Sequence, residues 1–360
     1  MRNTYLKLTT ILLLILPLCQ SFTNPSRCNN YPEYEDLPIN YFFWLGAHNI
    51  KPYYSKGNTV THMLHDGIRK LNINVCTRNG ITSLCSYSEK DDQHNISFEA
   101  FMDEVLDYVR QVFHQIIVIK IDSIVENPDH VATFQEMEFI IDNVCQLQTG
   151  HTAGLEIEDY IPFECPFIFV QPDHEKEWAT LGEVIDHYPD FISWDGDGED
   201  DGVQSKIILT NGKSLPKKSG DRLHYFSRVF SRNSYQPNQQ PNNLKEKIHK
   251  LCKSPKPITL QAYYNKDFST AKDEDHAKFY DADFIEDVIF SESGCNLNKT
   301  PKDTYFNSIE VNMYDQHNDM NYLKDLQRRM NKHNYEKFLK TVTPVKEEET
   351  AAKYDRHDEL

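Results

Sequence analysis

Short apolar runs alternate with amphipathic stretches along most of the chain. The runs are rich in Val, Ile and Phe, which favour β-strands; they read "YFFWLGA", "KLNINV", "ITSLCS", "QIIVIKID", "PFIFV", "SKIILT", "PITLQAYY" and "NSIEVNMY". Strands that are apolar along their whole length are typical of a parallel sheet covered on both faces. The pattern therefore predicts one α/β domain, a single (β/α)8 barrel of the TIM type, with functional residues at the carboxyl ends of its strands.

The amphipathic stretches supply the predicted helices. Residues 97–115 form the clearest one, because Ser97 is a favourable N-cap and the apolar residues after it share one helical face. These residues are Phe98, Phe101, Val105, Val109 and Val112. A second helix, "YLKDLQRRMN" at residues 322–331, closes the ordered part, so the barrel is predicted to span residues 38–332.

Both ends of the chain carry targeting signals. Residues 1–21 predict a signal peptide, because Arg2 and Lys7 precede the apolar run "ILLLILPLC". Residues 333–360 predict a flexible charged tail that ends in "HDEL", which a retrieval receptor of the endoplasmic reticulum reads. No later run reaches the roughly eighteen apolar residues of a membrane span. The protein is therefore predicted to reside in the lumen of the endoplasmic reticulum, with the HDEL retrieval receptor as a partner.

The chain is acidic, with a formal net charge of −17 at pH 7 and no cluster of Lys and Arg. This balance argues against a nucleic acid as partner. The acidic run "DGDGEDDG" at residues 195–202 does not fit an EF-hand, since Asp200 stands where that loop needs glycine and Lys206 where it needs glutamate. It is predicted to be a solvated loop.

The lumen of the endoplasmic reticulum permits disulfides and glycans. Seven cysteines follow the signal peptide, so at least one is unpaired: Cys28, Cys76, Cys85, Cys145, Cys165, Cys252 and Cys295. Cys76 and Cys85 lie on successive predicted strands and are candidates for a local disulfide, whereas the remaining connectivity stays open. Asn95 and Asn298 begin the sequons "NIS" and "NKT", so both are candidate glycosylation sites at the surface.

Polar residues follow or interrupt three of the predicted strands. His48 and Asn49 come directly after the first strand in "FFWLGAHNI", and Asp122 ends "QIIVIKID". His48 is predicted to line a pocket, the alternative being a structural histidine; Asp122 could equally cap a helix. Asn72 and Asn74 alternate with apolar residues in "KLNINV". Both therefore face the barrel interior, where we expect them to hydrogen-bond to each other or to Asn49.

Four segments, in order, resemble the X-domain of the phosphatidylinositol-specific phospholipases C. "WLGAHN" is similar to the family's first-strand motif, a hydrophobic run that ends in Gly-Thr-His-Asn. "HMLHDGIRKLNINV" resembles the next motif, a helix with a Gln-Leu-x-x-Gly-x-Arg pattern that leads into a strand, and "QIIVIKID" and "EWATLGEVI" match later segments. The resemblance covers residues 42–185 and implies the family's distorted TIM barrel.

The resemblance also implies hydrolysis of a phosphodiester in a phospholipid or phosphoinositol-type head group. In this family two histidines serve as base and acid, and calcium held by carboxylates, or an arginine, opposes the charge on phosphate. By position, His48 matches the first histidine, Asn49 the asparagine beside it, and Asp122 the acidic ligand on the fourth strand. Arg69 matches the family's structural arginine.

Three positions depart from the family pattern. Asn72 and Asn74 stand where calcium-dependent members carry Glu and Asp, and neither is the arginine of metal-free members. Ser86 stands where the second histidine is expected, and loss of that acid would lower the rate by about 10²- to 10⁴-fold. Ser86 is not expected to be a nucleophile, because no base and no nucleophile-elbow motif accompany it.

Calcium is expected to bind weakly. A site of Asn49, Asn72, Asn74 and Asp122 would carry a single formal negative charge, and calcium affinity follows ligand charge. The expected affinity is therefore about millimolar or weaker. Asn49 and Asp122 are the metal-ligand candidates.

The sequence supports three hypotheses. The first is a lumenal phospholipase C-like barrel with an impaired site that binds a lipid head group. The second is an active phosphoric diester hydrolase with His48 as base and an atypical acid. Other histidines considered for the missing acid are His62, His65 and His94. The first two precede the second strand, at the opposite end of the barrel. The third is a scaffold without catalysis. A glycerophosphodiester phosphodiesterase does not fit, because it would carry His-Arg-Gly where this chain has His-Asn-Ile.

Overall fold

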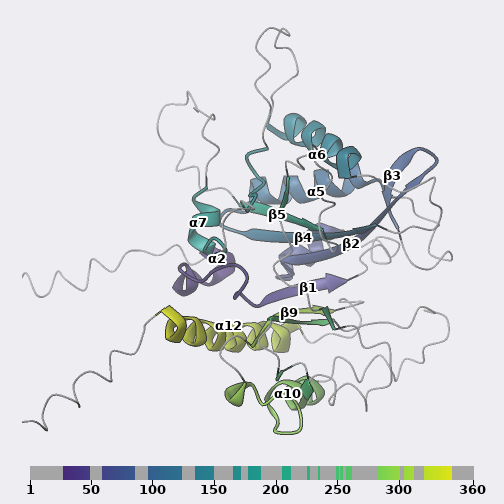
Figure 1. Cartoon of the computed structure of the whole chain (residues 1–360). Coiled ribbons are helices and arrows are strands. Elements are labelled where there is room, and N and C mark those ends of the chain that lie inside the picture. The colour runs from purple at the N-terminus through teal and green to yellow at the C-terminus, as the bar shows by residue number, and fades with distance from the viewer. Residues whose placement is uncertain are drawn as a thin grey trace, which may run out of the picture.

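One curved sheet forms the centre of the protein (Figure 1). The computed structural model describes residues 27–48, 59–85, 96–123, 134–149, 165–171, 177–187, 205–211, 225–227, 234–235, 249–250, 252–253, 257–261, 282–300, 304–311 and 320–342. Within them, nine strands form the sheet in the order β6-β5-β4-β2-β1-β9-β8-β7, with β3 paired to β2. The strands are β1 (Trp44–His48), β2 (Lys70–Arg78), β3 (Ile81–Leu84), β4 (Ile116–Ser123), β5 (Lys206–Asn211), β6 (Phe226–Ser227), β7 (Ser234–Tyr235), β8 (Pro257–Gln261) and β9 (Tyr305–Val311).

Apart from β3, every strand runs parallel to its neighbours. From β1 the order runs through β2, β4, β5 and β6 on one side and through β9, β8 and β7 on the other. Each parallel strand therefore lies beside the one that precedes or follows it along the chain, which is the winding of a (β/α)8 barrel. The predicted fold class is confirmed, and the described part of the sheet is open between β6 and β7.

Two of the predicted strands are not barrel strands. "ITSLCS" contains β3, which pairs antiparallel with β2 through the two-residue turn Asn79-Gly80. Both turn residues have a positive φ (50° and 77°), as this tight turn requires. In "PFIFV" the structure has a single bridge, between Ile168 and Ile207. The sheet is completed instead by β6 and β7, which have two residues each and are too short to give a periodic signal.

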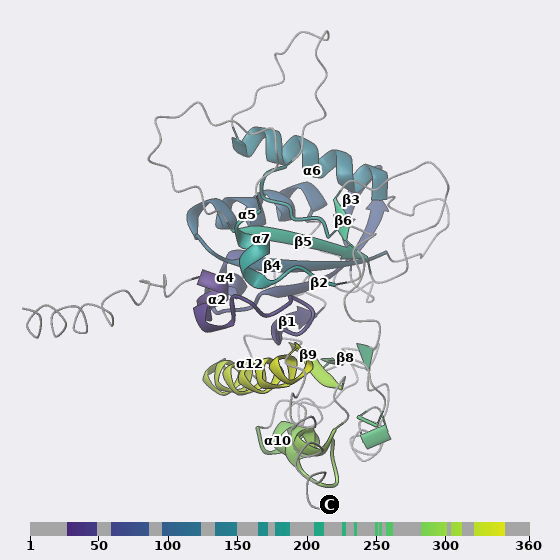
Figure 2. The ribbon, with the colours of Figure 1, turned by 60° about the vertical axis from the view of Figure 1, so that its left-hand side comes forward.

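Helices lie on both sides of the sheet. α5 (Phe98–Gln111) and α6 (Phe134–Thr149) lie on one side, and α10 (Ala282–Phe290) and α12 (Met320–Val342) on the other (Figures 1 and 2). α5 confirms the helix predicted over residues 97–115, and Ser97 Oγ accepts a hydrogen bond from Ala100 N at 3.0 Å. No described helix is both long and apolar enough to cross a membrane. The shorter helical segments are α2 (Arg27–Asn30), η2 (Pro32–Tyr34), α4 (Val60–His65), α7 (Leu181–Ile185) and η5 (Leu297–Lys299).

Apolar side chains fill the amino end of the barrel interior. Trp44 on β1, Val118 on β4 and Ile208 on β5 belong to a buried cluster that is separate from the larger core under the helices. The chain segment before β1 completes this cluster with Tyr34, Leu37, Ile39 and Phe42. The polar positions of the strands therefore lie above an apolar floor.

Described helices extend past both predicted boundaries of the barrel. α12 continues to Val342, so the boundary predicted at residue 333 falls inside this helix. The helix is held there because Asn334 Nδ2 donates to Tyr41 O at 2.7 Å and to Phe306 O at 2.8 Å. At the other end, α2 and η2 pack against the floor of the barrel before residue 38. The predicted signal peptide and the last eighteen residues, 343–360, lie outside the described residues.

Three disulfides join described cysteines: Cys76–Cys85, Cys145–Cys165 and Cys252–Cys295. The first confirms the predicted local pairing and ties the end of the β2–β3 hairpin together. Cys28 is the free cysteine among the described residues, and it is buried. Burial raises the pKa of its thiol to about 12, so little reactive thiolate forms at neutral pH.

Candidate functional site

The carboxyl ends of β1, β2 and β4 lie side by side. In the strand register His48 is opposite Asn72, and Asn72 is opposite Lys120. Two residues further along β2 and β4, Asn74 is opposite Asp122. Because residues opposite one another share a face of the sheet, the structure brings four predicted site residues to one edge of the barrel interior. Outside the described residues lie Asn49, Ser86 and the side chains of His48 and Asp122.

A buried ion pair lies one layer below this edge. Lys70 Nζ on β2 lies 2.8 Å from Glu310 Oε1 on β9, and their side chains are 5% and 1% exposed. β1 runs between the two strands, with Gly46 opposite both residues. A Cβ at Gly46 would lie 2.9 Å from Glu310 Cγ and 3.3 Å from Lys70 Cβ. The glycine of "WLGAHN" is therefore required by the close approach of two side chains across its strand.

Asn72 extends this network. Its Nδ2 donates to Glu310 Oε2 at 3.3 Å, so one carboxylate is bound by a lysine and an amide. The expectation that Asn72 and Asn74 bond to each other is wrong, because Asn72 bonds to Glu310 on β9 and Asn74 has no described partner; the alternative partner, Asn49, lies outside the described residues. The carboxamide of Asn74 is buried, and neither of its polar atoms has a hydrogen-bond partner among the described residues. Such a group lowers stability, and it is characteristic of functional positions.

Hydroxyl groups continue the network toward β8. Lys70 Nζ donates to Ser308 Oγ at 2.8 Å, and Ser308 Oγ donates to Thr259 Oγ1 at 3.1 Å. Thr259 Oγ1 in turn donates to Asn307 Oδ1 at 2.9 Å. Lys70 is thus oriented by groups on two other strands, β8 and β9, which leaves its ammonium little freedom.

Two lysines place positive charge in this part of the barrel. Burial lowers the pKa of Lys70, Glu310 raises it, and Lys120 lowers it further. Lys120 is half-buried and faces the interior, because its neighbours Ile119 and Ile121 lie in the outer core. Among the described side chains of this site, Lys70 is paired with Glu310, and Lys120 adds a second ammonium group close enough to affect the pKa of Lys70.

The described part of the site fits calcium poorly. Calcium takes six to eight oxygen ligands, and its affinity rises with the number of carboxylates among them. Glu310 is the described carboxylate of the site, and it already binds Lys70 and Asn72. Within the described part of the chain, no group of three His, Cys, Asp or Glu residues is placed to hold a metal ion.

Sequence reasoning missed Lys70, Lys120 and Glu310. Each is a charged residue inside an otherwise apolar strand run. Each stands at one of the alternate positions that face the barrel interior, as Asn72 does. Charged residues are rarely buried unless they are paired, so these positions were a usable signal. The signal does not say which strand supplies the partner.

Two of the other histidines considered from the sequence lie away from this edge. His62 and His65 belong to α4, which precedes the amino end of β2, as the sequence predicts. Arg69 lies beside this helix and donates two hydrogen bonds to Gln115 Oε1, at 3.1 and 3.0 Å, which supports a structural role. His94 lies outside the described residues.

A parallel sheet wound in barrel order, with polar and charged residues at the carboxyl ends of its strands, defines a (β/α)8-type protein with its site at that end.

Among solved structures, the chain is similar to phosphatidylinositol-specific phospholipase C from Listeria monocytogenes, with a TM-score of 0.48 and 11% identity over 82% of this chain and 94% of that chain. A variant of the Staphylococcus aureus phosphatidylinositol-specific phospholipase C gives a TM-score of 0.44 and 12% identity over 79% of this chain and 92% of that chain.

A calcium-dependent phosphoinositol-specific phospholipase C from a Pseudomonas species gives a TM-score of 0.32 and 13% identity, over 50% of this chain and 60% of that chain. No family model and no curated protein sequence matches the chain.

Proposed function

We propose that the protein is a phospholipase C-like barrel of the endoplasmic reticulum lumen with an impaired catalytic site. It binds a phospholipid or phosphoinositol-type head group at the carboxyl ends of β1, β2 and β4. The observation that carries this proposal is the network of Lys70, Glu310 and Asn72. Where the sequence resemblance implies two metal-binding carboxylates, the chain has two amides, and the nearby carboxylate is neutralised by a lysine.

The chemistry of the described side chains suits such a head group. Lys120, which lies opposite Asn72 in the strand register, would direct positive charge toward a phosphate. The carboxamides of Asn72 and Asn74 can each donate and accept hydrogen bonds, as the hydroxyls of an inositol-type ring require. The site therefore keeps groups that bind the ligand, while the second histidine and the metal-binding charge are replaced.

The lumenal location rests on the two terminal signals, and the retrieval receptor is the partner that the HDEL sequence implies. The three disulfides support it, because disulfides persist in oxidising compartments and are rare in the cytosol.

An active phosphoric diester hydrolase is the second candidate. His48 lies in register with Asn72 and Lys120, so a base at His48 would have an ammonium two strands away to oppose charge on the phosphate. In this case water, Ser86 or a group of the substrate takes the place of the missing acid.

Turnover measurements separate the two candidates. Purified mature protein would be incubated with phosphatidylinositol and glycosylated phosphatidylinositol, in calcium or in chelator, beside His48→Ala. Rates equal to buffer, together with binding of inositol phosphates that Lys120→Met weakens and the surface variant Lys253→Met does not, support the impaired-site proposal. Hydrolysis that His48→Ala abolishes would establish the second candidate instead. Absence of both turnover and binding would refute both.

A further inference from the structure

The sequon Asn298-Lys299-Thr300 begins within the 3-10 helix η5 and ends directly after it, shortly before β9 begins at Tyr305. Leu297–Lys299 form the 3-10 helix η5, and Lys299 N donates to Asn296 O at 2.8 Å. The side chain of Asn298 is exposed, as the sequence predicts. Access to the asparagine is therefore open in the folded protein.

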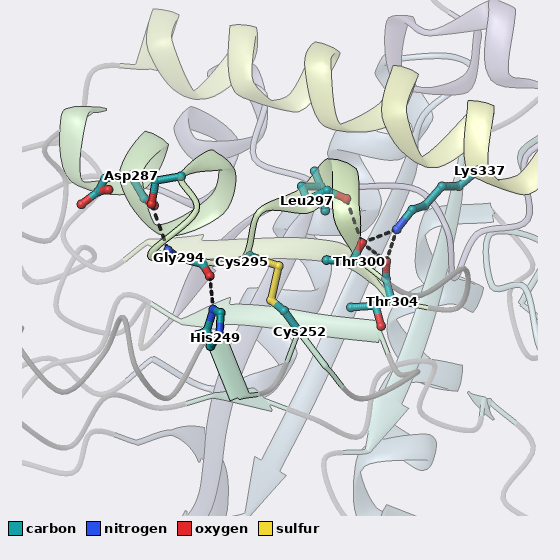
Figure 3. The surroundings of a disulfide bond; sticks show 10 residues. His249, Cys252, Asp287, Gly294, Cys295, Leu297, Thr300, Thr304 and Lys337 are labelled. Carbon is teal, nitrogen blue, oxygen red and sulfur yellow. Dashed lines mark hydrogen bonds between the residues drawn. A yellow bond between two sulfur atoms is a disulfide. The ribbon is translucent and has the colours of Figure 1, made fainter.

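The hydroxyl of the sequon threonine, by contrast, is occupied by hydrogen bonds within the fold. Thr300 Oγ1 donates to Leu297 O at 2.8 Å and accepts a hydrogen bond from Lys337 Nζ at 2.6 Å (Figure 3). Lys337, on α12, also donates to Thr304 O at 2.6 Å. The Lys337 ammonium group thus bridges Thr300 and Thr304, which flank the segment between η5 and β9. It occupies the sequon hydroxyl as long as α12 is packed in place.

A disulfide holds the other side of the sequon. Cys295 is bonded to Cys252, and Cys295 N donates to Val288 O at 2.8 Å. Asn296, between the disulfide and η5, is held with a positive φ of 50°. The sequon is therefore fixed at both ends and cannot be drawn into an extended conformation without loss of these contacts.

N-glycosylation requires an extended sequon with an accessible hydroxyl, and the folded structure provides neither. The Asn298 carboxamide nitrogen would attack the anomeric carbon of an oligosaccharide carried on a polyprenyl diphosphate. A nitrogen–carbon bond forms, the carbon–oxygen bond to the diphosphate breaks, the lipid diphosphate leaves, and an amide proton passes to a base of the transferase. The transferase binds an extended sequon through the hydroxyl of its third residue, which is Thr300.

We propose that Asn298 is a folding-gated glycosylation site, which accepts an oligosaccharide only before α12 packs over Thr300 and Cys295 joins Cys252. Folding and glycosylation then compete for the same hydroxyl. The glycan at Asn298 marks chains that fold slowly, and promptly folded chains leave this asparagine unmodified. In cells the inference depends on the proposed lumenal location, whereas the chemical test below does not.

The test compares folded and unfolded acceptors. Mature protein made without glycans, in its oxidised folded form, would be incubated with solubilised oligosaccharyltransferase and a lipid-linked oligosaccharide, beside the reduced unfolded chain and a peptide of residues 292–303. Mass spectrometry would measure occupancy at Asn298. We expect the peptide and the unfolded chain to be modified at least about tenfold faster than the folded protein, since the reaction follows the opened fraction. Equal rates, or a peptide that is not an acceptor, would overturn the proposal.

A second variant pair tests the role of α12 directly. Lys337→Met removes the hydrogen bond to Thr300, and Lys340→Met changes an exposed lysine one turn later on the same helix. In the folded state, Lys337→Met should raise the rate at Asn298 severalfold, by about the factor that one charged hydrogen bond supplies, and Lys340→Met should not. The same rate in both variants would show that Lys337 does not gate the site.

Discussion

Lys70 and Glu310 lie on strands β2 and β9, on either side of β1, and their side chains meet at 2.8 Å across Gly46. The pair is fully enclosed, so each charge depends on the other for the interactions that water would otherwise provide. A glycine, a lysine and a glutamate on three adjacent strands therefore form one structural unit beneath the candidate site.

Removal of one partner of this pair should lower the free energy of unfolding far more than removal of both. Lys70→Met leaves Glu310 charged and buried, and we expect the free energy of unfolding in urea to fall by about 3–5 kcal/mol. Lys70→Met combined with Glu310→Leu should recover most of that loss, because both charges are gone.

The exposed pair of Lys299 and Glu292 is the matched control, since it has a similar separation of 3.0 Å at the surface. Lys299→Met should change stability by less than about 1 kcal/mol. If Lys70→Met proved as mild as Lys299→Met, the pair would not hold the strands together.

Gly46→Ala should destabilise the protein because its methyl group meets Glu310. The added Cβ would lie 2.9 Å from Glu310 Cγ, and we expect a loss of about 1–3 kcal/mol in urea unfolding. In a Glu310→Ala background the same substitution should cost less, because the contacting atom is absent. Equal losses in both backgrounds would place the clash elsewhere, for example at Lys70 O, 3.1 Å away.

The sequence predicted the sheet and α5 because apolar periodicity is a local property that burial imposes on each element. It also contained the hairpin turn Asn79-Gly80, a strong local signal that was not used to separate β3 from the barrel. It could not predict β6 and β7, because two-residue strands exist through their partners. The contact of Lys70 with Glu310 was out of reach for a different reason: barrel closure places the last strand beside the first, but no local pattern fixes the register that sets both residues opposite Gly46.

The hairpin disulfide should support the candidate site as well as the fold. Cys85 N donates to Asn74 O at 2.8 Å, so the disulfide-bonded end of the hairpin is also hydrogen-bonded to the backbone of Asn74 on β2. Replacement of Cys76 and Cys85 by Ser should lower the midpoint of thermal unfolding and remove about 2–4 kcal/mol of stability. It should also weaken head-group binding severalfold.

The Cys252–Cys295 bridge provides the comparison, because it lies in the separate region around η5. Its replacement by Ser should lower stability without a change in head-group affinity. Equal effects of the two disulfides on binding would contradict a specific role for the hairpin.

Carboxylates at the two amide positions should create a calcium response that we do not expect of the natural chain. Asn72→Glu with Asn74→Asp adds two negative charges beside Asp122 in the strand register. Without metal this variant should be less stable than the parent, because the new charges repel Glu310. With millimolar calcium its melting temperature should rise by about 2–6 °C, whereas the parent should not shift. A similar rise in the parent would contradict the replacement of metal-binding charge.

Acid should destabilise the protein through His333. Burial is the main cause that lowers the pKa of this imidazole from 6.5 to about 4, and Lys337 and Lys340 add to it. Between these values the unfolded chain binds a proton that the native state does not, so stability falls as the pH drops from 6.5 to about 4. Because the ring is only half-buried, we expect a loss of about 1–2 kcal/mol.

His333→Gln is the variant that checks this assignment. Urea unfolding of both proteins between about pH 7 and pH 4 should show a smaller loss in the variant, by the amount that His333 contributes. Identical slopes would assign the acid sensitivity to other groups.

Among the described residues, an apolar floor closes the amino end of the barrel. Trp44, Val118 and Ile208 belong to this buried cluster, so a molecule bound beside Lys120 would have no exit through the amino end. Binding and release are therefore expected at the carboxyl end, and a bound ligand would have to dissociate before another could bind.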